Sequence, residues 1–216
     1  MKTVYLFSNF DNNNGFTEEV GKSIKANLLE RNSLVFIVSS PNGFDKSDFY
    51  YNVVKKWFFN IGIEFSNYYL IDNRIDKYKA IDLIEKSSCI FLMGGITREQ
   101  FAYIKNNGFL QSLQRYNGII MGISAGAINL AENSLSIGYP KDPESIMYKG
   151  IGITNKTIHP HFSVENIEEL IELKKFSQNN TIYGLCDFSA IVENDNTVKM
   201  FGNIYEIKNN VVKKIN

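Results

Sequence analysis

The pentapeptide Gly122-Ile123-Ser124-Ala125-Gly126 carries the residue types and spacing best suited to chemistry in this sequence. A G-x-S-x-G pattern places its serine on a sharp turn between a strand and a helix, with the hydroxyl lifted out of the sheet. The apolar run 118–121 and the helix-forming run 127–131 supply that strand and that helix. We therefore predict that Ser124 is a nucleophile and that the backbone N–H of Ala125 stabilises an oxyanion. The alternative is a purely structural glycine-rich turn.

A serine hydroxyl is a poor nucleophile unless a neighbouring base takes its proton. The sequence contains only two histidines, His159 and His161, and both lie in the segment His-Pro-His-Phe. Either of them could be the base for Ser124. A His-x-His pair on a strand could also hold zinc, because both rings then share one face. No third ligand lies at a suitable spacing, so we predict no metal.

The acid that would orient the histidine ring has four candidates. Asp142 and Glu144 lie between the serine and the histidines, and Glu132 lies on the helix predicted after the serine. Asp187 follows a predicted strand, and the carboxyl ends of strands line the crevice of an open α/β sheet. The residues alone do not decide which of these four acids orients the histidine.

A second glycine pair, Gly94-Gly95, ends the apolar run 89–93. Backbone N–H groups at this strand end could face the same crevice and complete an oxyanion hole. The alternative is a pair of packing glycines at a strand-to-helix turn. No Walker-type or G-x-G-x-x-G loop is present, so the sequence gives no support to nucleotide binding.

The elements that must position these residues alternate between short apolar strands and segments of helical period. Strands are predicted at 4–7, 34–38, 68–71, 89–93 and 118–123, and helices from 17, at 45–59, at 78–85, from a capping box at 97–100, at 125–132 and at 164–176. This alternation is typical of an α/β fold with a mostly parallel sheet. Predicted strands at 182–185, 190–192 and 198–207 suggest a C-terminal antiparallel β-hairpin.

Composition excludes several classes of protein. The 23 Lys and Arg residues balance 23 Asp and Glu residues, and no basic face stands out, as a binder of nucleic acid or anionic membrane would need. The longest apolar runs are far shorter than the ~20 residues that span a bilayer. The N-terminus lacks a secretory signal pattern. Cys89 and Cys186 lie within apolar stretches, and we expect both to be reduced, buried thiols. We expect a cytoplasmic, single-domain protein over 1–216, monomeric or homodimeric.

Three blocks of this sequence resemble the dipeptidase E group of serine peptidases, family S51, which also includes cyanophycinase. In the family's order the blocks are 91–97 (Phe-Leu-Met-Gly-Gly-Ile-Thr), 122–127 (Gly-Ile-Ser-Ala-Gly-Ala) and 159–162 (His-Pro-His-Phe), with a weaker fourth at 183–185 and 190–192. The family is similar in fold to class I glutamine amidotransferases, with serine in place of the cysteine nucleophile. The resemblance therefore implies a three-layer, doubly wound α/β fold with a nucleophile elbow.

The resemblance also implies roles for individual residues. Ser124 is the nucleophile, and His161, in Pro-His-Phe, is the base. The family's third residue lies about 15–18 positions after the serine, which implies Asp142 as the acid, with Glu144 just beyond that spacing. The implied activity is hydrolysis of amide bonds in short peptides through an acyl-enzyme, with no cofactor.

Around this implied triad, Gly95 and Ala125 supply the oxyanion N–H groups, while Gly94 and His159 lie beside the substrate. Dipeptidase E proteins carry an arginine between Pro-His-Phe and the next helix, whereas the stretch 163–169 here is acidic. A preference for an N-terminal aspartate therefore does not follow from the resemblance. Two other functions remain open: an ester or thioester hydrolase of α/β-hydrolase type, and a non-catalytic relative that binds peptides or small molecules.

Overall fold

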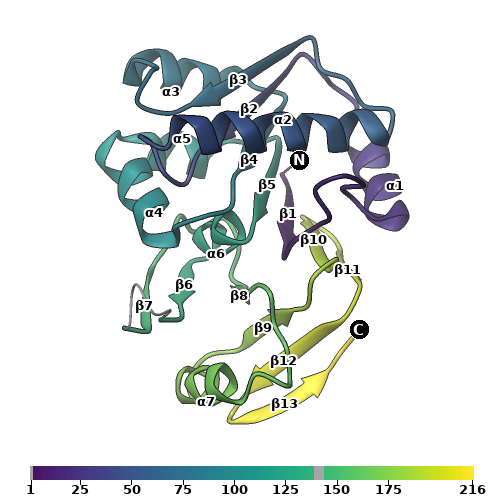
Figure 1. Ribbon diagram of the computed structural model, residues 1–216, viewed down its shortest axis with the longest axis vertical. Helices are drawn as coiled ribbons and strands as arrows, with labels where there is room; N and C mark the ends of the chain where they lie inside the picture. The colour runs from purple at the N-terminus through teal and green to yellow at the C-terminus, as the bar shows by residue number, and fades with distance from the viewer. Residues whose placement is uncertain (1, 139–143) are drawn as a thin grey trace.

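The computed structural model describes residues 2–138 and 144–216. A central sheet has the strand order β11-β10-β1-β5-β4-β2-β3, in which β1 to β5 are parallel (Figure 1). β10 runs antiparallel to β1, and β11 runs antiparallel to β10. The predicted α/β fold with a mostly parallel central sheet is thereby confirmed. The bounds are β1 (Thr3–Phe7), β2 (Ser33–Ile37), β3 (Asn67–Ile71), β4 (Cys89–Leu92), β5 (Ile119–Ile123), β10 (Ala190–Asn194) and β11 (Val198–Phe201).

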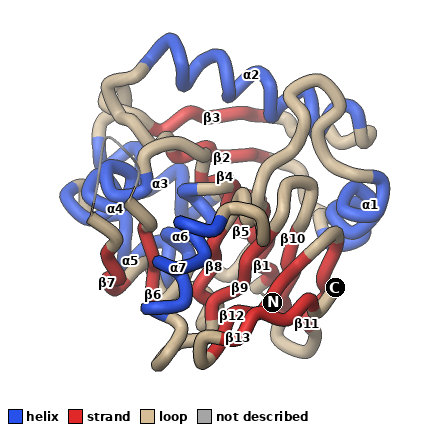
Figure 2. Tube along the Cα trace, turned by 60° about the horizontal axis from the view of Figure 1, so that its bottom comes forward, coloured by secondary structure: helices blue, strands red, loops and turns tan. Residues whose placement is uncertain are grey.

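Helices cover this sheet on both sides (Figure 2). α1 and α2 are neighbours, because a Cβ at Gly21 of α1 would lie 2.9 Å from the side chain of Ile61, just after α2. α5 packs against both α3 and α4 elsewhere on the sheet. The bounds are α1 (Glu18–Asn27), α2 (Phe44–Asn60), α3 (Lys77–Lys86), α4 (Thr97–Asn106), α5 (Phe109–Arg115), α6 (Ala125–Leu130) and α7 (Ile167–Phe176).

The capping box predicted at residues 97–100 is wrong. Ile96 is the N-cap residue of α4, and no side chain caps that end. The Gln100 side chain is buried instead, where its amide donates to the carbonyls of Met93 (2.9 Å) and Ile37 (3.3 Å) at the ends of two strands. Satisfying buried strand-end carbonyls takes precedence over the local cap, because an unpaired buried polar group is costly.

A second sheet, in the order β13-β12-β9-β8, lies beside the central one. The strand predicted at 198–207 is in fact two strands, β11 in the central sheet and β12 in the second, which are separated by Gly202 at φ +75°. β6 and β7 form a separate antiparallel pair. The bounds are β6 (Asn133–Ser136), β7 (Ile146–Lys149), β8 (Thr157–His159), β9 (Ile182–Leu185), β12 (Ile204–Lys208) and β13 (Val211–Lys214).

The junction of the two sheets positions the residues described below. β10 runs antiparallel to β1, and its first residue, Ala190, pairs with Phe7 at the end of β1. The β9–β10 connection therefore crosses from the second sheet to the carboxyl edge of the central one. β8 runs parallel to β9 and ends beside it, so the segment after β8 reaches the same edge.

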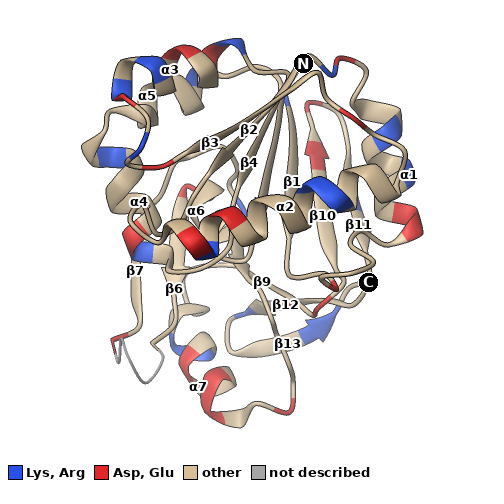
Figure 3. Cartoon of the chain, turned by 45° about the horizontal axis from the view of Figure 1, so that its top comes forward, with Lys and Arg blue, Asp and Glu red and all other residues tan. Residues whose placement is uncertain are grey.

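Other sequence-based expectations concern charge, thiols and membranes. Acidic and basic side chains are interspersed over the helices (Figure 3). Cys89 is buried, Cys186 is partly buried, and both are free thiols. Within residues 2–138 and 144–216, no helix combines the length and the apolar character needed to cross a membrane.

Candidate active site

Ser124 lies on the turn between β5 and α6 with φ 51° and ψ −112°, a backbone conformation that costs energy in a non-glycine residue. Its backbone N–H donates to the carbonyl of Phe7 (3.0 Å). A Cβ at Gly122 would lie 2.5 Å from the backbone of Gly126, and a Cβ at Gly126 would lie 2.2 Å from the carbonyl oxygen of Leu92. Both motif glycines are thus required by close backbone approach.

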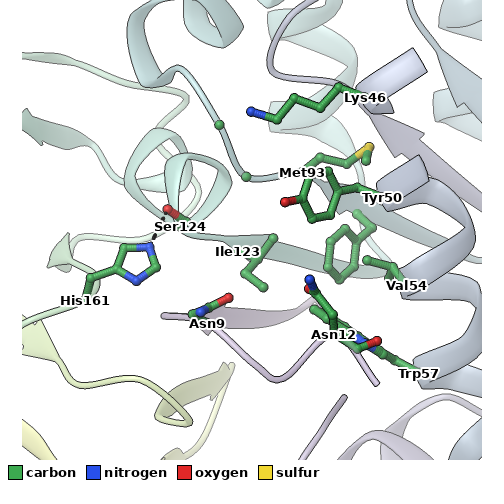
Figure 4. Close-up of a pocket in the computed structure, with 13 residues that line it drawn as sticks. Asn9, Asn12, Lys46, Tyr50, Val54, Trp57, Met93, Ile123, Ser124 and His161 are labelled. Carbon is green, nitrogen blue, oxygen red and sulfur yellow. Dashed lines mark hydrogen bonds between the residues drawn. The ribbon is translucent and has the colours of Figure 1, made fainter. Parts of the chain in front are cut away.

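His161 follows β8 and directs its ring at the serine. Its Nε2 lies 3.0 Å from Ser124 Oγ, at hydrogen-bond distance (Figure 4). The histidine also has a positive φ, 57°, and its backbone N–H donates to the hydroxyl of Ser8 (2.7 Å). Ser8 is buried directly after β1, so a rigid part of the central sheet holds the histidine backbone.

Asp187 lies in the β9–β10 connection, on the other side of the His161 ring. Its Oδ1 is 2.9 Å from His161 Nδ1, and the Ser8 hydroxyl donates to the same oxygen at 3.3 Å. The side chains of His161 and Asp187 are 40% and 44% exposed, so water can reach both. Ser124, His161 and Asp187 therefore form a continuous hydrogen-bonded chain at the carboxyl edge of the central sheet.

Gly94 and Gly95 end β4 beside this chain. A Cβ at Gly94 would lie 3.4 Å from Ser124 Cβ, and Gly95 has φ +138°. The Ser39 hydroxyl donates to the carbonyl of Gly94 (2.8 Å), and a Cβ at Gly95 would lie 2.0 Å from that hydroxyl oxygen. The glycine pair thus allows the chain to pass between Ser39 and the serine on the elbow.

The sequence matches Peptidase family S51 over residues 6–201, which is most of the chain. The chain belongs to peptidase family S51. The resemblance seen in the sequence blocks is therefore confirmed, and by family the protein is a serine peptidase. No curated protein matches the sequence.

Solved structures of peptidases share the fold of this S51 peptidase. A peptidase from an acI-B1 Actinobacterium has a TM-score of 0.74 at 14% identity, and the match covers 100% of this chain and 94% of that chain. A protein from Listeria monocytogenes EGD-e, provisionally assigned as a peptidase E, has a TM-score of 0.68 at 18% identity, with 93% and 98% covered. At these identities the likeness concerns the fold.

Among the described residues of this S51 peptidase, neither Glu144 nor Glu132 bonds His161. Asp142 lies outside the described residues, and Glu144 is exposed with no hydrogen bond to the ring. Glu132 pairs instead with Lys149 at 3.0 Å. Asp187 was a candidate because it follows a predicted strand, and it is the described carboxylate that bonds His161 Nδ1.

The resemblance implies that His159 lies beside the substrate, but this residue does not line the pocket next to Ser124. Its side chain is buried on β8, with Nε2 3.0 Å from Glu169 Oε1 on α7, although that contact lacks hydrogen-bond geometry. The ring also packs edge-on against Phe162. Alternation along an extended segment explains this placement: residues two apart share a face only while the strand continues, and β8 ends at His159.

A pocket of about 220 Å³ opens beside the serine and the histidine (Figure 4). Apolar side chains, all buried, form its floor. They are Val54, Trp57, Phe91, Met93 and Ile123. Its polar members are Asn9, Asn12, Tyr50 and Lys46, with Gly94 and Gly95 completing the wall.

Sequence reasoning did not identify Ser8, Asn9 or the α2 residues of this pocket. Ser8 and Asn9 follow β1 directly, and residues at the carboxyl ends of strands line the crevice of an open α/β sheet, so the argument that identified Asp187 applies to them too. Val54 and Trp57 have the helical spacing of ordinary core residues, and the sequence contains no signal that sets them apart. Among the described residues, no group of three or more His, Cys, Asp or Glu side chains could hold a metal ion.

Proposed function

We propose that this S51 peptidase cleaves amide bonds of short peptides by a serine mechanism with an acyl-enzyme intermediate. The observation that carries the proposal is the hydrogen-bonded chain from Ser124 Oγ through His161 to Asp187, with distances of 3.0 and 2.9 Å. Nucleophile, base and orienting acid in this order are the arrangement that activates a serine in unrelated hydrolases.

In the proposed mechanism, His161 Nε2 takes the proton of Ser124 as its Oγ attacks the substrate carbonyl. The same nitrogen then delivers that proton to the leaving amine, and the acyl-enzyme is hydrolysed by water in a second cycle. Asp187 accepts from Nδ1–H, which fixes the tautomer with Nε2 free to accept and stabilises the positive ring that forms.

The backbone N–H groups of Ala125 and Gly95 are the proposed oxyanion donors. Ala125 begins α6, where N–H groups lack partners within the helix, and Gly95 lies in the pocket wall beside the serine. A donor of this kind contributes about 3–4 kcal/mol to transition-state stabilisation in comparable sites.

The hydrogen-bonded acid also distinguishes this proposal from a non-catalytic relative. A binding protein that had lost its triad would not need a carboxylate within ~3.2 Å of the histidine nitrogen that faces away from the serine. Asp187 lies at 2.9 Å from that nitrogen, and Ser8 holds both partners.

Labelling with a fluorophosphonate tests the proposal. We expect the wild type and Ser66→Ala, a change at an exposed serine directly before β3, to label at one site, and Ser124→Ala not to label. Dipeptide hydrolysis by the wild type and its loss in Ser124→Ala complete the test. Unlabelled wild type, or equal labelling of Ser124→Ala, contradicts the mechanism. Turnover of p-nitrophenyl esters without turnover of any peptide favours an ester hydrolase.

A further inference from the structure

We propose that the pocket beside Ser124 binds the side chain on the acyl side of the scissile bond, and that it selects an uncharged, apolar side chain of leucine or phenylalanine size. This inference rests on the proposed serine mechanism. It concerns the same site, and it names the class of substrate that the site accepts.

The position of the base decides which half of the substrate the pocket receives. His161 Nε2 must hand its proton to the leaving amine, so the amine departs on the histidine side of Ser124. The acyl half then extends away from His161. Figure 4 shows Ser124 and His161 at one end of the pocket and Tyr50, Val54 and Trp57 toward the other end.

The size of the pocket fits one side chain. Its volume of about 220 Å³ is below the ~300–1,000 Å³ of pockets that enclose a drug-sized ligand. The floor is held rigidly by aromatic packing, because Trp57 meets Phe16 edge-on at 5.6 Å between ring centroids and its Nε1–H donates to the carbonyl of Asn12 (3.2 Å). A floor that cannot rearrange discriminates by size.

The chemistry of the lining favours an uncharged occupant. The five floor residues bury their side chains and offer no partner to a charge, so an ionised group placed there would lose its hydration without compensation. None of the described lining residues is Asp or Glu, so a lysine or arginine side chain finds no counter-charge. Lys46, exposed at the rim, repels such a cation further. A carboxylate that paired with Lys46 would stay at the exposed rim and leave the apolar floor empty, so an acidic side chain gains nothing from burial there.

The test uses diphenyl esters of α-aminoalkylphosphonates, which react with an activated serine and place one variable side chain on the acyl side. We measure second-order inactivation rates for glycine, alanine, leucine, phenylalanine, aspartate and lysine analogues. The leucine or phenylalanine analogue should react about 10- to 100-fold faster than the glycine analogue, from the free energy of burying a large apolar side chain. The aspartate and lysine analogues should react no faster than the alanine analogue.

Variants of α2 locate the effect in the pocket. Val54→Phe fills the floor and should remove most of the leucine preference, while Tyr50→Ala widens the pocket from a partly exposed position and should shift the preference toward phenylalanine. Lys46→Met should raise the lysine-to-leucine rate ratio about three- to fivefold, as expected for one rim charge. Lys56→Met, the same change at an exposed position of the same helix outside the pocket, should leave that ratio unchanged.

A fluorophosphonate without a side chain separates the two proposals. If it labels Ser124 while the analogue series shows no leucine or phenylalanine preference, or prefers aspartate or lysine, the pocket assignment is wrong and the serine mechanism stands. If Ser124 is not labelled at all, both proposals fail. Should Val54→Phe not fold, Tyr50→Ala decides, and an unchanged size preference in that variant overturns the assignment.

Discussion

Replacing Asp187 by asparagine should reduce peptide hydrolysis by two to three orders of magnitude without unfolding the protein. The carboxylate accepts from His161 Nδ1 and from the Ser8 hydroxyl, at 2.9 and 3.3 Å. An amide of the same shape can present its NH₂ group to Nδ1, which leaves the hydrogen of the neutral ring on Nε2. That tautomer cannot accept the proton of Ser124.

The magnitude follows from the exposure of the pair. A carboxylate and an imidazolium about 4 Å apart attract by about 4 kcal/mol near a protein surface and by about 1 kcal/mol in water. Because the two side chains are 44% and 40% exposed, we take about 2 kcal/mol between these limits for the lost charge stabilisation. Loss of the correct tautomer and ring orientation adds about 1–2 kcal/mol, of the order of one hydrogen bond. The sum of about 3–4 kcal/mol corresponds to a roughly 200- to 1,000-fold fall in kcat/KM.

The assay compares kcat/KM on a dipeptide and the rate of fluorophosphonate labelling, since both depend on serine activation. Asp142→Asn and Glu144→Gln are the controls, because family spacing points to these acids, and each should change kcat/KM less than twofold. Thermal unfolding of each variant monitors the fold. The reasoning is refuted if Asp187→Asn keeps more than a tenth of wild-type kcat/KM, or if Asp142→Asn loses as much as Asp187→Asn.

Three further variants or measurements probe the supports of the site. Ser8→Ala leaves the partly buried N–H of His161 without its acceptor, and should lower the free energy of unfolding by about 0.5–1.5 kcal/mol and slow Ser124 labelling at least tenfold. Gly126→Ala forces a Cβ to within 2.2 Å of a backbone oxygen and should cost at least about 2 kcal/mol in urea unfolding, whereas Gly43→Ala, with contacts no closer than 3.4 Å, should cost less than half as much. Burial raises the pKa of both thiols, and the charge of Asp187 raises the pKa of Cys186 further. At pH 8 a thiol reagent should therefore modify Cys186 more slowly than it modifies free cysteine. Cys186 should react faster in Asp187→Asn than in the wild type, and Cys89 should react only after the protein unfolds.

How much of the site the sequence predicts depends on how local each signal is. The signal for the elbow is local. Gly122 and Gly126, each two residues from Ser124, must be glycine because other backbone atoms lie where a Cβ atom would be. The choice between His159 and His161 depends on where β8 ends, which the sequence does not mark, and it was the resemblance that favoured His161.

The position of the acid depends on long-range topology. The family spacing favoured Asp142, which lies before β8, whereas the ring nitrogen meets a residue that follows β9. The second sheet creates this proximity by pairing β8 with β9, and a strand as short as β8, three residues, leaves little periodicity to recognise. The central sheet was easier to predict because fully buried parallel strands appear as continuous apolar runs.

The end of β1 explains why strained backbone persists at three places in this site. Ser124, His161 and Phe188 all have positive φ, a conformation that costs about 1–3 kcal/mol at such a residue, and they lie in three separate connections. Each is held by a hydrogen bond from its backbone N–H to one of three consecutive residues, 7–9. The bonds are Ser124 to the Phe7 carbonyl (3.0 Å), His161 to the Ser8 hydroxyl (2.7 Å) and Phe188 to the Asn9 carbonyl (2.8 Å). Because two sheets meet at this one segment, the geometry of the proposed nucleophile, base and acid depends on residues 7–9 as well as on contacts among the three side chains.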